Sequence, residues 1–320
     1  LVRYVDIFYQ QIYFFVREKL FNLNSMETIP YDKRSGKIWF NGELVDWKNA
    51  KVHLLNHGLH YASCVFEGER VYDGEIFKLE EHTDRLFHSA KRMGIIMPYN
   101  EKIINDACKE IITVQKIKNG YVRPVVWRGS EMMAISAQKN KIHVAVAAWE
   151  WGSYFDPKLK LKGIKLKTSP WRRPPPNSVP WDTKAAGLYM ICTLSKHDAE
   201  SKGYTDALML DHEGNIAEAT GANIFFKDKV GTLHTPVPDS FLDGITRRCV
   251  IGIAISKGIK VVERKIKPEE MPNFVGCFLT GTAAEITPVS QIDKFNFDVC
   301  ELIKDLSESY QKLVRKKVAA

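Results

Sequence analysis

The chain has 320 residues, of which 45% are hydrophobic and 26% charged, as in globular proteins large enough for two cores. Its net charge is +8, but basic and acidic residues are interspersed and no dense basic run with interleaved aromatics occurs. This composition argues against a nucleic-acid-binding protein and suits small anionic ligands such as phosphates and carboxylates.

The first 25 residues differ from the rest of the chain. They are aromatic and aliphatic, contain no glycine or proline, and are interrupted by charges. The apolar run is too short to span a bilayer, and no small-residue cleavage site follows it, which argues against a secretory signal. We interpret residues 1–36 as an extension before the first domain, with Met26 close to where the globular pattern begins. A mitochondrial transit peptide is the alternative for residues 1–25.

Residues 37–155 are predicted to form a small α/β domain. Asn41-Gly42 and Asp73-Gly74 each lie between two apolar runs, which is typical of tight hairpins. Apolar residues at helical spacing predict helices at about 80–93 and 101–116. Alternating patterns predict strands at 121–127 and 142–149.

Residues 156–164 are interpreted as an interdomain connector and residues 165–320 as a larger α/β domain. The predicted fold class is therefore mixed α/β in two domains. In this half the pattern indicates helices at about 186–202, 244–257 and 299–314, a strand–turn–strand unit from 206, and strands at 163–168, 259–262 and 277–279.

Lys184 follows a proline-rich stretch that includes Pro174, Pro175, Pro176 and Pro180. Proline fixes φ and removes a backbone donor, so this segment is stiff. The residues after the lysine, 185–187, are small and leave room for a flat aromatic ligand. A single lysine is most often a solvated surface charge, so its importance depends on the rest of this half.

Two segments could bind a phosphate. Gly244-Ile245-Thr246 opens a predicted helix, where free N–H groups and the helix dipole favour an anion. The small residues of Thr280-Gly281-Thr282-Ala283-Ala284 follow a predicted strand and let backbone N–H groups approach an anion closely. Either segment alone is more often a plain cap or turn.

Together with Lys184, the segments 218–225, 233–235 and 242–247 resemble the signature of the class IV, or fold-type IV, pyridoxal-phosphate aminotransferases. The resemblance implies pyridoxal 5'-phosphate as cofactor and Lys184 as the catalytic residue that holds its aldehyde. It also implies that Glu218 keeps the pyridine nitrogen protonated. The other cofactor-binding residues implied are Arg85, Tyr189, Gly244, Ile245, Thr246 and Thr282.

The segments 56–68, 121–124 and 281–288 narrow the resemblance to the branched-chain amino-acid aminotransferases, over about residues 37–315. In this family Tyr121 and Arg123 are expected to bind the substrate carboxylate. The substrate-binding residues implied are Tyr61, Phe66, Tyr121, Arg123, Met133, Ile135, Trp151, Tyr154, Ala283 and Ala284. Of these, Tyr61 and the loop with Met133 and Ile135 are expected to come from the partner subunit of a homodimer.

Two features depart from the family pattern. The loop 129–135 carries Glu131 and has no glycine after Gly129, so we expect an added negative charge near the substrate pocket to weaken acceptance of a dicarboxylate. The residues directly before the lysine, Trp181-Asp182-Thr183, are bulkier than expected. Both features are expected to affect substrate range more than reaction type.

The predicted function is transfer of the amino group between branched-chain L-amino acids and 2-oxoglutarate, giving branched-chain 2-oxo acids and glutamate. The six scattered cysteines have no metal-ligand spacing, which favours reduced thiols, a cytoplasmic protein and no metal. Alternatives are a D-amino-acid aminotransferase, an aminodeoxychorismate lyase and a catalytically silent RNA-binding or scaffold relative. The sequence leaves open the preference among leucine, isoleucine, valine and aromatic acids, dimer or hexamer, and a biosynthetic or catabolic role.

Overall fold

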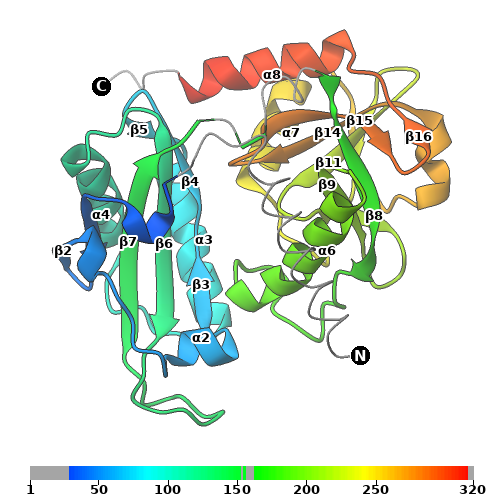
Figure 1. The fold of residues 1–320 in the computed structure, drawn as a ribbon. Helices are drawn as coiled ribbons and strands as arrows, with labels where there is room; N and C mark the ends of the chain where they lie inside the picture. The colour runs from blue at the N-terminus through cyan, green and yellow to red at the C-terminus, as the bar shows by residue number, and fades with distance from the viewer. Residues whose placement is uncertain (1–28, 153, 156–161, 316–320) are drawn as a thin grey trace, which may run out of the picture.

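The computed structural model describes residues 29–152, 154–155 and 162–315. The predicted extension over residues 1–25 and most of the predicted connector lie outside these residues. The described chain forms two lobes side by side, each built around its own sheet (Figure 1).

The first lobe contains an antiparallel sheet of seven strands. They are β1 (Lys37–Phe40), β2 (Glu43–Asp46), β3 (Cys64–Phe66), β4 (Glu69–Tyr72), β5 (Glu75–Ile76), β6 (Gly120–Arg128) and β7 (Ile142–Glu150). Their order is β2-β1-β7-β6-β4-β5, and β3 also pairs with β6. Both predicted hairpins are confirmed. In each turn two successive residues have positive φ, 51° and 98° at Asn41-Gly42 and 52° and 90° at Asp73-Gly74, which matches the right-handed twist of the strands.

Helices α3 (Leu79–Arg92) and α4 (Glu101–Val114) pack against this sheet, close to the predicted bounds. Their buried residues recur at helical spacing, as Leu86 and Ala90 do on α3. Asn100 caps α4, because its side chain accepts a hydrogen bond from the backbone N–H of Ile103. The lobe also contains α2 (His57–Tyr61), η1 (Tyr31–Lys33) and η2 (Trp47–Asn49), which the sequence pattern did not indicate.

The second lobe contains a sheet of nine strands. They are β8 (Ile164–Arg172), β9 (Asp206–Leu210), β10 (Ile216–Ala219), β11 (Asn223–Asp228), β12 (Leu233–Thr235), β13 (Val261–Glu263), β14 (Phe274–Gly281), β15 (Glu285–Ile292) and β16 (Phe295–Asn296). The order is β10-β9-β8-β15-β14-β11-β12-β13, and β10 also pairs with β11. Six strands therefore form a closed ring, and the β10–β11 pairing completes it.

Helices α6 (Met190–Ser201), α7 (Ile245–Ser256) and α8 (Glu301–Val314) pack on this sheet, and η4 (Pro268–Asn273) precedes β14. The helix predicted at 186–202 begins as the 3₁₀ turn η3 (Ala186–Tyr189), so the segment after Lys184 is tighter than an α-helix. The proline-rich stretch lies between β8 and η3, outside both.

The two lobes share a core of aromatic side chains. Tyr72 of β4 belongs to one buried cluster with Phe225, Phe278 and Tyr310, and its hydroxyl donates to Glu285 Oε1 at 2.9 Å. Helix α8 lies across the top of the larger lobe and ends next to the smaller one (Figure 1). The lobes are thus joined by buried aromatic contact.

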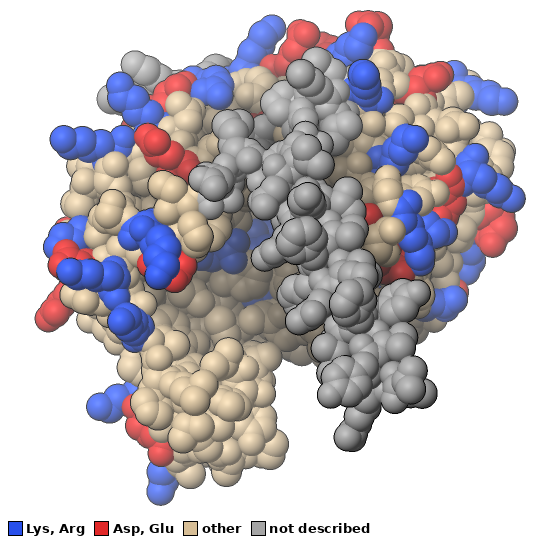
Figure 2. Space-filling model, in the orientation of Figure 1, with Lys and Arg blue, Asp and Glu red and all other residues tan. Residues whose placement is uncertain are grey.

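The visible face of the protein carries interspersed basic and acidic side chains (Figure 2). In the part of the chain that the structure describes, no helix has both the length and the apolar character needed to cross a membrane.

We expect Leu86→Ala to lower the free energy of unfolding by about 2–5 kcal/mol, since it removes a fully buried side chain between α3 and the sheet. Lys91→Ala, at an exposed position of the same helix, is the control and should change stability by less than about 0.5 kcal/mol. Denaturant unfolding followed by circular dichroism measures both. Equal effects of the two substitutions would contradict this packing.

Candidate active site

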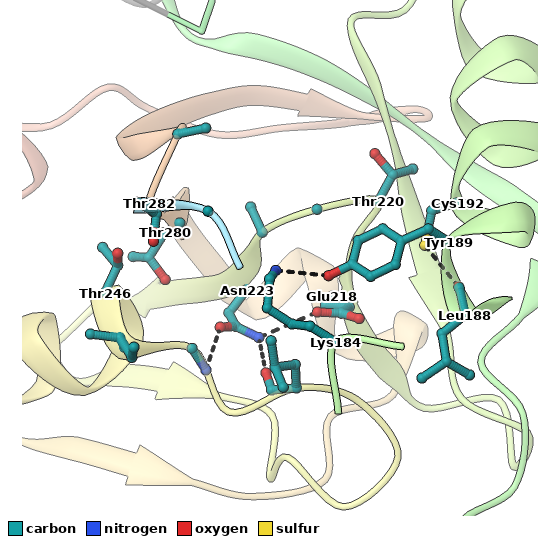
Figure 3. Close-up of a pocket in the computed structure, with 18 of the residues that line it drawn as sticks. Lys184, Leu188, Tyr189, Cys192, Glu218, Thr220, Asn223, Thr246, Thr280 and Thr282 are labelled. Atoms are coloured by element: carbon teal, nitrogen blue, oxygen red, sulfur yellow. Dashed lines mark hydrogen bonds between the residues drawn. The ribbon is translucent and has the colours of Figure 1, made fainter. Parts of the chain in front are cut away.

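A pocket lined by both lobes contains Lys184. The smaller lobe contributes Gly68, Arg85 and Tyr121, and the larger lobe contributes the ends of β10, β11 and β14 and the start of α7. Figure 3 shows two ends of this pocket. The hydroxyls of Thr246, Thr280 and Thr282 gather at one end, and Lys184, Tyr189 and Glu218 lie toward the other.

Strand register places three of the lining side chains in one row. Glu218 of β10 is paired with Asn223 of β11, which is paired with Thr280 of β14. Directly paired residues on neighbouring strands project to the same face of a sheet, so this row faces the pocket. The pairing that closes the strand ring therefore also sets the distance between Glu218 and the hydroxyl end.

Asn223 connects the row to α7. Its Oδ1 accepts from the N–H of Gly244 at 3.1 Å, and its Nδ2 donates to Leu242 O at 2.9 Å. A side chain at position 244 would collide with this amide, because an added Cβ would lie 2.3 Å from Asn223 Oδ1. Asn223 thus holds the start of α7 against the pocket.

Lys184 lies between β8 and η3 with its amine directed at an aromatic pair. Its Nζ donates to the Tyr189 hydroxyl at 2.9 Å and lies 5.0 Å from the centre of the Phe66 ring. The backbone is fixed as well, because Phe66 N–H donates to Lys184 O at 3.2 Å. The amine is therefore positioned within the pocket.

Glu218 is buried beside a buried arginine. Burial raises the pKa of Glu218 to about 7, and the positive charges of Arg173 and Lys184 act against that rise. Arg173 Nε lies 3.5 Å from Glu218 Oε1, and Arg173 is only 4% exposed. Because its pKa lies near neutrality, Glu218 can hold or release a proton at an aromatic nitrogen placed next to it.

The hydroxyl end suits a phosphate. The first N–H groups of α7 have no partner within the helix, and they point along its axis into the pocket with the positive end of the dipole. Thr280 Oγ1 is buried and makes no hydrogen bond to any described residue. The Thr282 side chain also lies at this end (Figure 3), and the Arg85 side chain lines the same pocket.

Arg85 is fixed by a buried carboxylate, Glu67. Arg85 Nε and Nη2 donate to Glu67 at 2.7 and 2.9 Å, and His82 Nδ1 lies 2.7 Å from the same carboxylate. Burial alone would raise the pKa of Glu67, but Arg85 and His82 outweigh it and hold that pKa well below its usual range. Nearby Glu69 is equally buried, and burial and the charge of Glu67 raise its pKa well above the usual value. Of the two acids, Glu67 is the ionised one.

These residues fit the cofactor that the sequence resemblance implied. A primary amine, a buried carboxylate and a cluster of anion-binding donors lie in one pocket, in the arrangement that the aldehyde, ring nitrogen and phosphate of pyridoxal phosphate require. The buried Thr280 hydroxyl, without a partner among the described residues, is the most direct sign that a polar group fits at the phosphate end. Among the residues described, no group of three or more His, Cys, Asp or Glu side chains could hold a metal ion.

The residues expected to bind the substrate extend from Lys184 as a continuous line of contacts. The guanidinium of Arg123 stacks on Phe66 at 4.5 Å and donates to the Tyr121 hydroxyl at 3.3 Å. The line then continues along the aromatic rings, from Tyr121 to Trp151 at 4.6 Å and from Trp151 to Tyr154 at 5.9 Å. It offers one cationic group within a largely aromatic wall.

Four further expected residues, Tyr61, Met133, Ile135 and Ala284, are not among those that line the Lys184 pocket in the single chain. The Tyr61 hydroxyl donates to Met133 O at 3.1 Å, and the Ile135 side chain is 82% exposed. Ala283 lines the pocket, whereas Ala284 is buried in the core of the larger lobe. These placements leave the expected roles of Tyr61, Met133, Ile135 and Ala284 as predictions.

Glu131 takes part in the loop between β6 and β7. Its Oε2 accepts from the backbone N–H of Lys141 at 3.1 Å, and Glu131 is not among the residues that line the Lys184 pocket. In the single chain, this carboxylate therefore stabilises the base of its own loop.

Sequence reasoning missed the residues that support this site: Glu67, His82, Arg173, Asn223 and Thr280. Glu67 and Asn223 lie inside segments that the sequence singled out, and Thr280 belongs to the second predicted phosphate corner. Glu67 directly follows the apolar residues Val65 and Phe66, which is a weak local signal. His82 lies in a charged stretch from Glu80 to Arg85, so nothing local distinguishes it. Nothing local to Arg173 distinguishes it from the exposed Arg172 beside it.

Comparisons with known proteins agree with this geometry. The family described as amino-transferase class IV matches residues 64–292. A protein from Rickettsia conorii named probable branched-chain-amino-acid aminotransferase is 44% identical over 283 residues, 87% of this chain and 96% of that protein. A Pseudomonas aeruginosa branched-chain-amino-acid aminotransferase is 42% identical over 264 residues, covering 81% and 86%. A crystal structure of a branched-chain amino acid aminotransferase from T.th. with pyridoxamine 5'-phosphate has a TM-score of 0.85 at 36% identity, covering 89% of this chain and 96% of that one.

We expect Glu67→Gln to destabilise the protein by about 3–5 kcal/mol at pH 7, because it leaves the Arg85 guanidinium without its carboxylate. The folded pKa of Glu67 is depressed, so its contribution is present above the ordinary pKa of a glutamate, about 4.3, and is lost as the pH falls below it. On acidification from about pH 5 to 3, wild type passes the ordinary pKa of a glutamate and loses the contribution of Glu67. The variant lacks this contribution and should therefore lose less stability over the same range.

Thermal unfolding at several pH values measures both effects. Glu80→Gln, which removes an exposed carboxylate from α3, the helix that carries Arg85, is the control and should follow wild type. Parallel stability curves for wild type and Glu67→Gln over acidic pH would contradict an ionised Glu67.

Proposed function

This chain belongs to the amino-transferase class IV family, and from that premise we propose that it transfers the amino group between branched-chain L-amino acids and 2-oxoglutarate, with pyridoxal phosphate as cofactor. The family and the mixed α/β fold class indicated by the sequence are confirmed. The observation that carries the proposal is one pocket with the Lys184 amine, the buried Glu218 carboxylate and a cluster of anion-binding donors.

The residues at the two ends of the pocket hold the cofactor. The N–H groups at the start of α7, the Arg85 guanidinium and the hydroxyls of Thr280 and Thr282 bind its phosphate. Glu218 keeps the ring nitrogen protonated, and Arg173 favours the ionised form of Glu218 that this needs. Bound in this way, pyridoxal phosphate supplies an electron sink for the substrate α-carbon.

Lys184 has two functions in this proposal. Its amine would hold the cofactor aldehyde, and once free it would take up and return the substrate α-proton as general base and acid. The Tyr189 hydroxyl, 2.9 Å from Nζ, keeps the lysine directed into the pocket. Because this hydroxyl accepts from Nζ, its own O–H would be available as a donor to the cofactor's phenolic oxygen.

The aromatic line beyond Lys184 supports the choice of substrates. Phe66, Trp151 and Tyr154 offer apolar area to a branched side chain and few polar groups that burial would leave unpaired. Arg123 provides a cation for a carboxylate, and its Nε is buried without a hydrogen-bond partner among the described residues. The names of the similar proteins support the same substrates.

We also propose that the protein acts as a homodimer or larger homo-oligomer in the cytoplasm. The segment before α2 and α2 itself expose Val52, Leu54, Leu55 and Leu59. The lower end of the smaller lobe, where Figure 1 places α2 and the β6–β7 loop, shows few charges in Figure 2. Large exposed apolar patches mark protein interfaces. All six cysteines are free, which supports a reducing compartment.

We expect purified protein with pyridoxal phosphate to show a visible absorbance band that L-leucine removes and 2-oxoglutarate restores. Lys184→Ala should show neither the lysine-bound band nor the response, because no amine remains to hold the aldehyde. Lys202→Ala, at an exposed position of the α6 C-terminus, is the control and should behave as wild type. Wild type that binds no cofactor would overturn the enzyme proposal, and a response to D-leucine alone would overturn the substrate proposal.

We expect Leu59→Asp to shift the protein toward monomer and lower its activity by at least about tenfold, since a charge would be buried in the proposed interface. Val230→Asp is the control, because Val230 is 87% exposed in the turn between β11 and β12. Light scattering after size-exclusion chromatography measures the assembly. A wild-type monomer with full activity would refute the dimer.

A further inference from the structure

The segment before Lys184 is held to helix α3 by an acidic residue. Asp182 Oδ2 lies 2.8 Å from His88 Nε2, and Asp182 Oδ1 accepts from Arg92 Nε at 3.0 Å. His88 and Arg92 are four residues apart, so both lie on one face of α3. This clasp joins segments that lie far apart in the sequence.

The same face of α3 holds the lysine itself. Ser89 Oγ accepts from the backbone N–H of Lys184 at 3.0 Å, and Arg85, one turn earlier, lines the pocket. Helix α3 therefore carries both a phosphate-binding cation and the attachment points of the lysine segment. A shift of the segment along α3 would move the amine relative to Arg85.

The lysine segment, residues 180–184, also has a hydrogen bond within itself, and this bond does not attach it to the rest of the molecule. Thr183 Oγ1 donates to Pro180 O at 2.6 Å, which stabilises the turn only internally. Glu218 and the hydroxyl end of the pocket belong to the larger lobe, whereas the lysine segment is attached to α3 of the smaller lobe. Strand β3 holds the segment as well, because Phe66 N–H donates to Lys184 O at 3.2 Å. The alignment of the amine with Glu218 thus depends on where α3 and β3 hold the segment.

We propose that Asp182, clasped by His88 and Arg92, is a positioning residue for Lys184 that couples the alignment of its amine to the phosphate-binding helix α3. The proposal rests on the function proposed above. Burial favours the neutral acid, but the hydrogen bonds from His88 and Arg92 hold the pKa of Asp182 below its usual value, so the Asp182 carboxylate is ionised at neutral pH.

The place of the clasp indicates what its loss should change. Asp182 and His88 line a second pocket, which shares Arg85, Leu242 and Ile245 with the first. The clasp is thus part of the wall behind the phosphate end. Loosening it should weaken cofactor binding and misalign the lysine, with little effect on the substrate side, where Tyr121 and Arg123 lie.

The test compares wild type with Asp182→Ala, Asp182→Asn and Arg92→Met. For Asp182→Ala we expect about five- to tenfold weaker binding of pyridoxal phosphate to the apoprotein, a shifted pH midpoint of the visible band and a similar fall in kcat with KM for L-leucine unchanged. Asp182→Asn keeps an acceptor oxygen, so its affinity for pyridoxal phosphate and its kcat should lie between those of wild type and Asp182→Ala. Arg92→Met, at the exposed end of α3, should show a smaller effect in the same direction and keep the test valid if Asp182→Ala does not fold.

The matched control is Asp106→Asn, which breaks an exposed ion pair with Lys102 on α4 and should match wild type in every measurement. The double variant Asp182→Ala with Arg92→Met should bind pyridoxal phosphate as well as Asp182→Ala alone and have the same kcat. The reason is that the two substitutions remove the same interaction. Additive losses, or wild-type affinity and pH midpoint in Asp182→Ala, would overturn the clasp while leaving the proposed function intact. If wild type itself does not hold pyridoxal phosphate through Lys184, both proposals fail.

Discussion

The buried Glu67 carboxylate is the interaction on which the arrangement of this pocket depends. It lies between β3 and β4 with no exposed surface, and it orients Arg85 and His82 of α3. A buried ionised group is tolerated only when it is paired and hydrogen-bonded, so Glu67 and α3 fix each other. The position of α3 then determines both the phosphate-binding cation and the attachment of the lysine segment.

The larger lobe supplies the opposing half of the site by a different means. Its strands close into a ring at β10 and β11, and this closure brings Glu218, Asn223 and Thr280 into one row. The start of α7 lies next to this row, because Asn223 Oδ1 accepts a hydrogen bond from the N–H of Gly244. The closed strand ring thus lies on one side of the pocket, and a helix fixed by a buried charge lies on the other. Such a pair of supports suits a cofactor whose two ends need opposite charges.

Regular elements with a clear period were predicted well. Helices α3, α4, α7 and α8 lie within about two residues of their predicted bounds. Each has apolar residues at helical spacing on one face, and this spacing is typical of a helix that packs on a core. Strand β15 was not predicted, because Pro288 in its middle lacks a donor and makes the segment resemble a loop. The short α2 carries too few residues for a periodic signal, and η3 was predicted as the start of α6.

The sequence by itself determined the chemical groups of the site and the family, because Lys184, Glu218 and the two anion-binding corners lie in short segments of recognisable composition. The predicted domain bounds and the individual roles of the substrate residues stay predictions. Only the tertiary structure decided that Arg173 faces Glu218, that Glu67 orients Arg85 and that Asp182 meets His88 and Arg92. These pairs join separate elements, and local patterns of hydrophobicity and turn residues carry no information on which charged side chains meet when the elements pack.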